Sequence, residues 1–82
     1  MATVHFSSAL TPYTGGIETV DIDAPRVREL ILALIKRFPT VAEPLERMAV
    51  AIDGEIYNND TAAYHRLARD TTVHFVPPVA GG

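Results

Sequence analysis

The sequence contains no cysteine, no tryptophan and no long apolar run among its 82 residues. Without cysteine the chain can form no disulfide framework, no thiolate nucleophile and no thiolate metal site. Its longest aliphatic stretch, Leu30 to Ile35, is far shorter than the roughly 20 residues that span a bilayer. Seven Lys and Arg stand against ten Asp and Glu, a formal net charge of −3. We therefore expect neither nucleic acid nor a membrane as a partner.

The N-terminus, Met1 to His5, lacks the basic start and apolar stretch of a signal peptide, so we expect a cytoplasmic protein. With 48% hydrophobic residues, a chain of this length predicts one small domain with a modest core and no deep catalytic cleft. It has no Gly-x-Ser-x-Gly nucleophile motif and no phosphate-binding loop. We predict that the chain is not itself an enzyme and binds no cofactor.

Hydrophobic periodicity predicts a hairpin followed by a helix. Apolar and polar residues alternate over 2–8 and over 17–22, and a turn containing Gly15-Gly16 joins the two segments. From Val27 to Phe38 the apolar residues recur at helical spacing, which indicates one amphipathic helix with a core-facing stripe. Asp23 precedes this stripe and is a good N-cap residue, so the helix is expected to start there.

The remaining elements are predicted to be short. They are strands over 48–52, 55–57 and 72–76, an Asp53-Gly54 turn, and single turns of helix after Pro44 and within 62–67. This order predicts the α+β class in the β-grasp, or ubiquitin-like, arrangement. A mixed sheet of four to five strands packs on one main helix, with the first and last strands side by side in the middle. The β-grasp domain is expected to span residues 1–76.

The last six residues predict an extended, flexible C-terminal tail. They are Pro77, Pro78, Val79, Ala80, Gly81 and Gly82. The two prolines cannot donate to a sheet ladder, and they stiffen the start of the tail. The small residues after them can enter a narrow active-site tunnel of a partner, which makes the α-carboxylate of Gly82 the candidate reactive group. The alternative is a frayed domain end.

A single helix covers only one face of the predicted sheet, and the other face is a candidate partner contact. His74 and Val76 on the last strand are expected to face outward, joined by Ala51 and His5 on neighbouring strands. Partly apolar patches of this kind mark protein contacts, although scattered surface residues are the alternative. A zinc site needs three or four ligands, and His65 lies on a separate loop, so we predict no metal site.

Residues 73–82 resemble the Phe-x-Pro-Pro-Val-small-Gly-Gly ending of molybdopterin synthase small subunits. Residues 10–16 are more similar to the Leu-x-Pro-x-Thr-Gly-Gly segment of the thiocarboxylate carriers of cysteine biosynthesis. Those carriers also end in Val-Ala-Gly-Gly, whereas the molybdopterin proteins usually have Arg-Glu at Thr11-Pro12. Over essentially its full length, the chain resembles the ThiS/MoaD family of ubiquitin-like sulfur carriers.

The resemblance implies that an ATP-using, ubiquitin-activating-like enzyme adenylates Gly82 and that sulfur transfer then gives a C-terminal thiocarboxylate. It implies an acceptor in molybdopterin, thiamin or cysteine biosynthesis, such as a molybdopterin synthase large subunit or a pyridoxal-phosphate-dependent cysteine synthase. The chain then acts as a carrier or as the small subunit of a sulfurtransferase. Two alternatives stay open. One is a ubiquitin-like modifier joined to lysines through Gly82, and the other is a non-covalent interaction domain.

Overall fold

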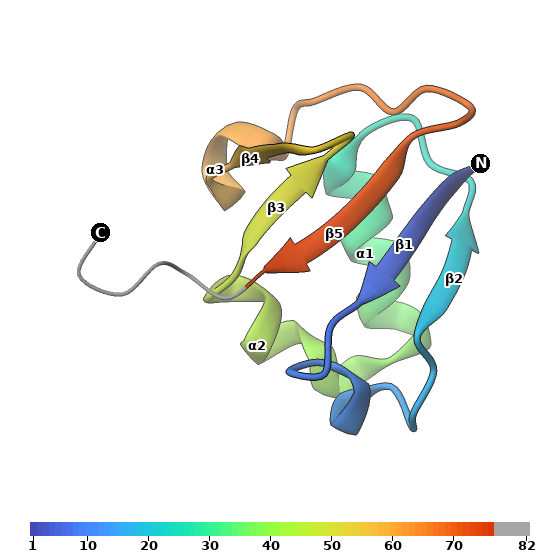
Figure 1. Ribbon diagram of the computed structural model, residues 1–82, viewed down its shortest axis with the longest axis vertical. Helices are drawn as coiled ribbons and strands as arrows, with labels where there is room; N and C mark the ends of the chain where they lie inside the picture. Colours follow the sequence, from blue (N-terminus) through green and yellow to red (C-terminus); the bar gives the residue numbers. More distant parts are fainter. Residues whose placement is uncertain (77–82) are drawn as a thin grey trace.

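The computed structural model describes residues 1–76, apart from the side chains of Asn59 and Asp60. Within these residues five strands form one mixed sheet, and helix α1 lies across one of its faces (Figure 1). The strands are β1 (Ala2–Phe6), β2 (Thr19–Ile22), β3 (Ala49–Ile52), β4 (Glu55–Tyr57) and β5 (Thr72–Val76). The helices are α1 (Val27–Arg37), α2 (Ala42–Glu46) and α3 (Asn59–Ala62), with 3-10 turns at Thr11–Tyr13 and Pro39–Val41.

The strand order across the sheet is β2-β1-β5-β3-β4. The two central strands, β1 and β5, run parallel, and every other neighbouring pair is antiparallel. The predicted β-grasp arrangement, with the first and last strands side by side in the middle, is therefore confirmed. Asp53 and Gly54 both have positive φ, 49° and 89°, which is the backbone of the tight turn expected between β3 and β4.

The core lies between the sheet and the helical layer. Strands contribute alternate residues to it, and Val4, Val73 and Phe75 on the central pair are at most 1% exposed. From α1, Val27, Leu30 and Leu34 are completely buried, which confirms the predicted core stripe. The flanking Ile31, Ile35 and Phe38 are half-buried and pack against this core.

The predicted start of α1 at Asp23 is wrong, because backbone groups from a distant segment cap the helix instead. The residue before the helix is Arg26, and its side chain makes no capping hydrogen bond. The first amides of the helix, those of Val27 and Arg28, donate to the carbonyl oxygens of His65 and Ala63, each at 3.0 Å. These bonds satisfy amides that a side-chain cap would otherwise serve.

Two other short helices differ from their predicted positions. Helix α2 begins at Ala42 rather than after Pro44, because a proline in the first turn has no need of its missing amide hydrogen. Helix α3 lies at Asn59–Ala62, before most of the predicted 62–67 turn, and the Ala62 amide donates to the Asn58 carbonyl at 2.8 Å. No helix in the described part of the chain is long and apolar enough to cross a membrane. The predicted tail, 77–82, lies outside the described residues.

Candidate functional site

The face of the sheet that points away from α1 carries the residues that alternate with the core positions. We call it the open sheet face. Its residues are Thr19 and Asp21 on β2, Thr3 and His5 on β1, Thr72, His74 and Val76 on β5, Ala49 and Ala51 on β3, and Ile56 on β4. All five strands contribute to it, and β5, which ends at Val76, lies between β1 and β3 (Figure 1).

A row of imidazole and apolar side chains crosses the middle of this face. His5 pairs with His74 across the two parallel central strands, and their rings stack with centroids 4.6 Å apart and planes only 9° from parallel. On the other side of His74 lies Ala51, which in turn pairs with Ile56. The methyl group of Ala51 is only 8% exposed between its two larger neighbours, whereas Ile56 is 66% exposed.

The end of β5 extends this row toward the tail. Val76, which pairs with Ala49 on β3, is half-buried and is the last residue that the structure describes. Ser7 lies just beyond the pair of Phe6 and Phe75, at the same edge of the sheet. Its hydroxyl oxygen is buried and has no hydrogen-bond partner among the residues that the structure describes. The base of the tail therefore combines an apolar side chain with an unused hydroxyl group.

The opposite part of the open sheet face is polar. The Thr3 hydroxyl donates to the Asp21 carboxylate at 2.9 Å across β1 and β2. The face thus divides into a polar half on β2 and β1 and a mostly apolar half on β5, β3 and β4, with the stacked histidines at the boundary. An apolar patch with a polar margin is the usual composition of a protein contact surface.

The open sheet face offers little for catalysis or metal binding. The lone pairs of two parallel imidazole rings lie in parallel planes, so the stacked histidines do not direct both nitrogens at one ion. His65 packs against the Tyr57 ring instead, with centroids 5.0 Å apart. Among the side chains that the structure describes, no group of three or more His, Cys, Asp or Glu residues is placed to hold a metal.

The structure brings together the four predicted contact residues that it describes, since His5, His74, Ala51 and Val76 all lie on the open sheet face. Pro77, Pro78, Val79, Ala80, Gly81 and Gly82 lie outside the described residues. Ile56 and Ser7 were not among the predicted contact residues. The strand predicted over 2–8 already contained Ser7, but placing Ile56 requires the register between β3 and β4.

Comparison with models of known protein families shows the family to which this chain belongs. A model of the ThiS family matches residues 4–82 of this chain. The chain belongs to the ThiS family. This membership confirms the resemblance to ThiS/MoaD-type ubiquitin-like carriers, and the match includes the Gly-Gly ending as well as the β-grasp domain. A search of curated proteins gives no match.

Solved structures share the fold of this ThiS-family chain over nearly its full length. A chain of the Amycolatopsis orientalis BexX/CysO complex superposes with a TM-score of 0.84 at 22% identity and covers 100% of both chains. The small archaeal modifier protein 1 of Methanosarcina acetivorans gives 0.82 at 16% identity, covering 99% of this chain and 95% of its own.

A third structure, a putative molybdopterin converting factor subunit 1 from Pyrococcus furiosus, gives a TM-score of 0.78 at 22% identity and covers 95% of this chain and 97% of its own. At such low identities these likenesses establish the fold alone. They confirm the mixed sheet and main helix of the β-grasp arrangement.

Proposed function

We propose that this chain is a sulfur carrier and that Gly82 is its reactive residue. One carboxylate oxygen of Gly82 attacks the α-phosphorus of ATP in a partner enzyme, which forms an acyl-adenylate and releases pyrophosphate. Hydrosulfide, or a donor that supplies it, then displaces AMP and leaves a C-terminal thiocarboxylate. The carboxylate needs this activation because, with an ordinary pKa near 3.5, it is an anion and a poor electrophile at neutral pH.

The observation that carries this proposal is the family match, which extends through Gly82. The residue types of the tail agree with this proposal, because the last four residues are small and the two prolines before them favour an extended backbone. The described part of the chain offers the carrier no cluster of metal ligands. In this proposal the catalytic groups belong to the partners, and Gly82 must bear the free α-carboxylate.

The open sheet face is the proposed docking surface for the adenylating enzyme. It lies at the edge from which the tail begins, so a partner bound there can receive the tail directly. Val76 and the exposed Ile56 supply the apolar contact, and the stacked pair of His5 and His74 lies between this apolar half and the polar half of the face. Holding an extended tail costs roughly 1–2 kcal/mol of backbone entropy per residue, which backbone hydrogen bonds from the partner must offset.

The experiment is intact-mass spectrometry after incubation with the cognate adenylating enzyme, ATP and a sulfide source. The wild-type chain should gain a mass equal to the replacement of one oxygen by sulfur. Deleting Gly82, or adding one alanine beyond it, moves the carboxylate by about 3.5 Å. Because misplacement by about 1 Å can cost a hundredfold in rate, neither variant should be sulfurated.

Gly81→Val is the matched variant that keeps the length of the tail. It should fold as the wild type does, by circular dichroism, and should fail in the same assay because a side chain obstructs a tunnel shaped for glycine. The proposal is refuted if the wild type, given its true partner, never gains sulfur. It is equally refuted if the chain extended by alanine is sulfurated as fast as the wild type without being trimmed.

The same mass assay can identify the enzyme that accepts the sulfur. Incubating the thiocarboxylate form with a molybdopterin synthase large subunit, or with a pyridoxal-phosphate-dependent cysteine synthase, together with that enzyme's own sulfur-accepting substrate, should consume the thiocarboxylate only with the cognate enzyme. The second candidate function is a protein modifier, and the fold shared with the small archaeal modifier protein 1 favours testing it. Conjugates to lysine that survive reduction and depend on Gly82 would support that function instead.

A further inference from the structure

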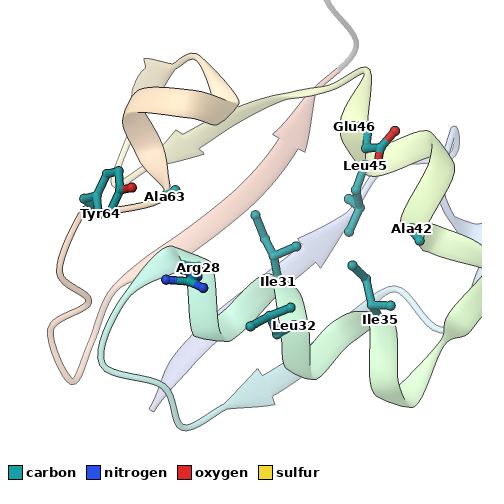
Figure 2. A pocket seen from close by; sticks show the side chains of 9 residues that line it. All are labelled: Arg28, Ile31, Leu32, Ile35, Ala42, Leu45, Glu46, Ala63 and Tyr64. Atoms are coloured by element: carbon teal, nitrogen blue, oxygen red, sulfur yellow. The ribbon is translucent and has the colours of Figure 1, made fainter.

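The helical layer carries a second surface, an apolar groove that sulfur transfer does not use. It has a volume of about 700 Å³ and lies between α1, α2 and the turn after α3. Figure 2 shows its side chains: Ile31, Leu32 and Ile35 project from α1, Leu45 from α2, and Tyr64 stands at the opposite wall. The groove belongs to the layer that covers the sheet, so it faces away from the open sheet face.

Two residues of this groove are unusually exposed for their type. Leu32 on α1 is 56% exposed and Tyr64 is 75% exposed, although both are large and apolar in character. On α1, Leu32 lies outside the core face, where Leu30 and Leu34 are completely buried. Leu32 therefore extends the apolar side of α1 beyond the half-buried Ile31 and Ile35, and all three line the groove. Exposed apolar surface in a concave site favours a binding role.

Opposite charges stand at the two ends of the groove. Arg28 lines one end, and beside it Arg26 and Arg66 are directly paired across an antiparallel bridge. In the described part of the chain none of these arginines makes an ion pair. Exposed Glu46 lines the other end, near the C-terminal half of α1. A ligand with negative charge at the Arg28 end and positive charge at the Glu46 end would therefore complement the groove.

The size of the groove favours a slender occupant. From Arg28 to Ile35 the groove follows about two turns of α1, or about 10 Å. A stable dimer buries about 800 Å² on each partner, far more than a strip of this length provides, so a second copy of the chain is a poor fit. An amphipathic helix fits between two helices through side chains spaced three and four residues apart.

We propose that this groove binds an amphipathic helix of a partner protein, with the acidic first turn of that helix at Arg28 and its basic last turn at Glu46. Helices commonly carry acidic residues in the first turn and basic residues in the last, because the helix dipole favours that order. The bound helix then runs in the same direction as α1. Because the groove and the open sheet face lie on different layers, this partner and the adenylating enzyme can bind at the same time.

The test uses two synthetic peptides of about ten residues, a length that places the first and last helical turns about 10 Å apart. Both are held helical by a side-chain staple and share one apolar stripe. One has glutamates in its first turn and lysines in its last turn, and the other has these ends exchanged. Titration into the ¹⁵N-labelled full chain should shift amides around the groove, with the first peptide binding about fivefold tighter or more, because exposed ion pairs contribute modestly but add up.

Variants of the chain sharpen the test. Leu32→Ser should weaken binding of the first peptide about tenfold, because a buried leucine anchor is lost. Arg28→Glu should reverse the preference toward the peptide with exchanged ends. Ile56→Ser removes a similarly exposed apolar side chain from the open sheet face and should leave binding of both peptides unchanged.

The proposal is overturned if neither peptide binds, if both bind equally, or if Leu32→Ser has no effect. Concentration-dependent dimerisation that Leu32→Ser abolishes would assign the groove to a second copy. Tighter peptide binding after deletion of residues 77–82 would assign it to the chain's own tail. Peptide binding does not depend on sulfuration of Gly82, so each proposal can fail without the other.

Discussion

Leu30→Ala tests the position of α1 against the sheet. Leu30 is completely buried in the core and lies near the middle of the helix. Truncating a buried leucine to alanine costs about 2–5 kcal/mol, because transfer free energy is lost and a cavity is left behind. At roughly 0.05–0.15 kcal/mol per residue, a domain of this size has a total stability of only about 4–12 kcal/mol. The midpoint of thermal unfolding should fall by about 8 °C or more.

The matched control is Leu32→Ala on the same helix. Helix propensity and chain composition change identically in the two variants, but Leu32 is 56% exposed, so the expected change in stability is within about 0.5 kcal/mol. Urea denaturation, followed by the helical circular dichroism signal at about 222 nm, gives the free energy of unfolding of the wild type and of both variants. Equal losses in both variants would refute the reasoning, since α1 would then present a different face to the sheet.

Two further substitutions test the site and the loop that follows β1. Val76→Asp places a charge on the open sheet face and should leave the circular dichroism spectrum unchanged. It should weaken binding to the adenylating enzyme, as measured by calorimetry. Loss of folding would instead show that Val76 belongs to the core. Thr14, only 3% exposed, donates its hydroxyl hydrogen to the Ile17 carbonyl at 2.7 Å, so Thr14→Val should cost about 1–3 kcal/mol in urea denaturation. A cost near zero would mean that water replaces this bond.

The elements that depend on local signals could be predicted from the sequence. The turn at Asp53-Gly54 needs two positive φ values, and this pair of residues tolerates them, so the β3–β4 hairpin followed from the sequence. Alternation in the first and last strands likewise placed His5 and His74 on one face. Their stacking then required only that β1 and β5 be neighbours in the β-grasp arrangement.

What could not be predicted depends on contacts between residues far apart in the chain. The start of α1 is fixed by carbonyl groups of Ala63 and His65, more than 30 residues away, and no local pattern indicates that pairing. The burial of Ala51 depends on its register with Ile56 and His74. Tyr64 becomes a wall of the groove only because the turn after α3 returns to α1.

Strand β5 is the only described strand that joins the two outer parts of the sheet by hydrogen bonds. The β1–β2 hairpin pairs with one of its edges and the β3–β4 hairpin with the other. Until β5 is in place, the chain has two separate two-stranded ribbons, and such ribbons are marginal on their own. During synthesis β5 emerges after every other strand, so the central ladder closes last. The end of β5 at Val76 therefore lies within a complete open sheet face only in a chain that has finished folding, and a partner that binds this face selects against incompletely folded copies.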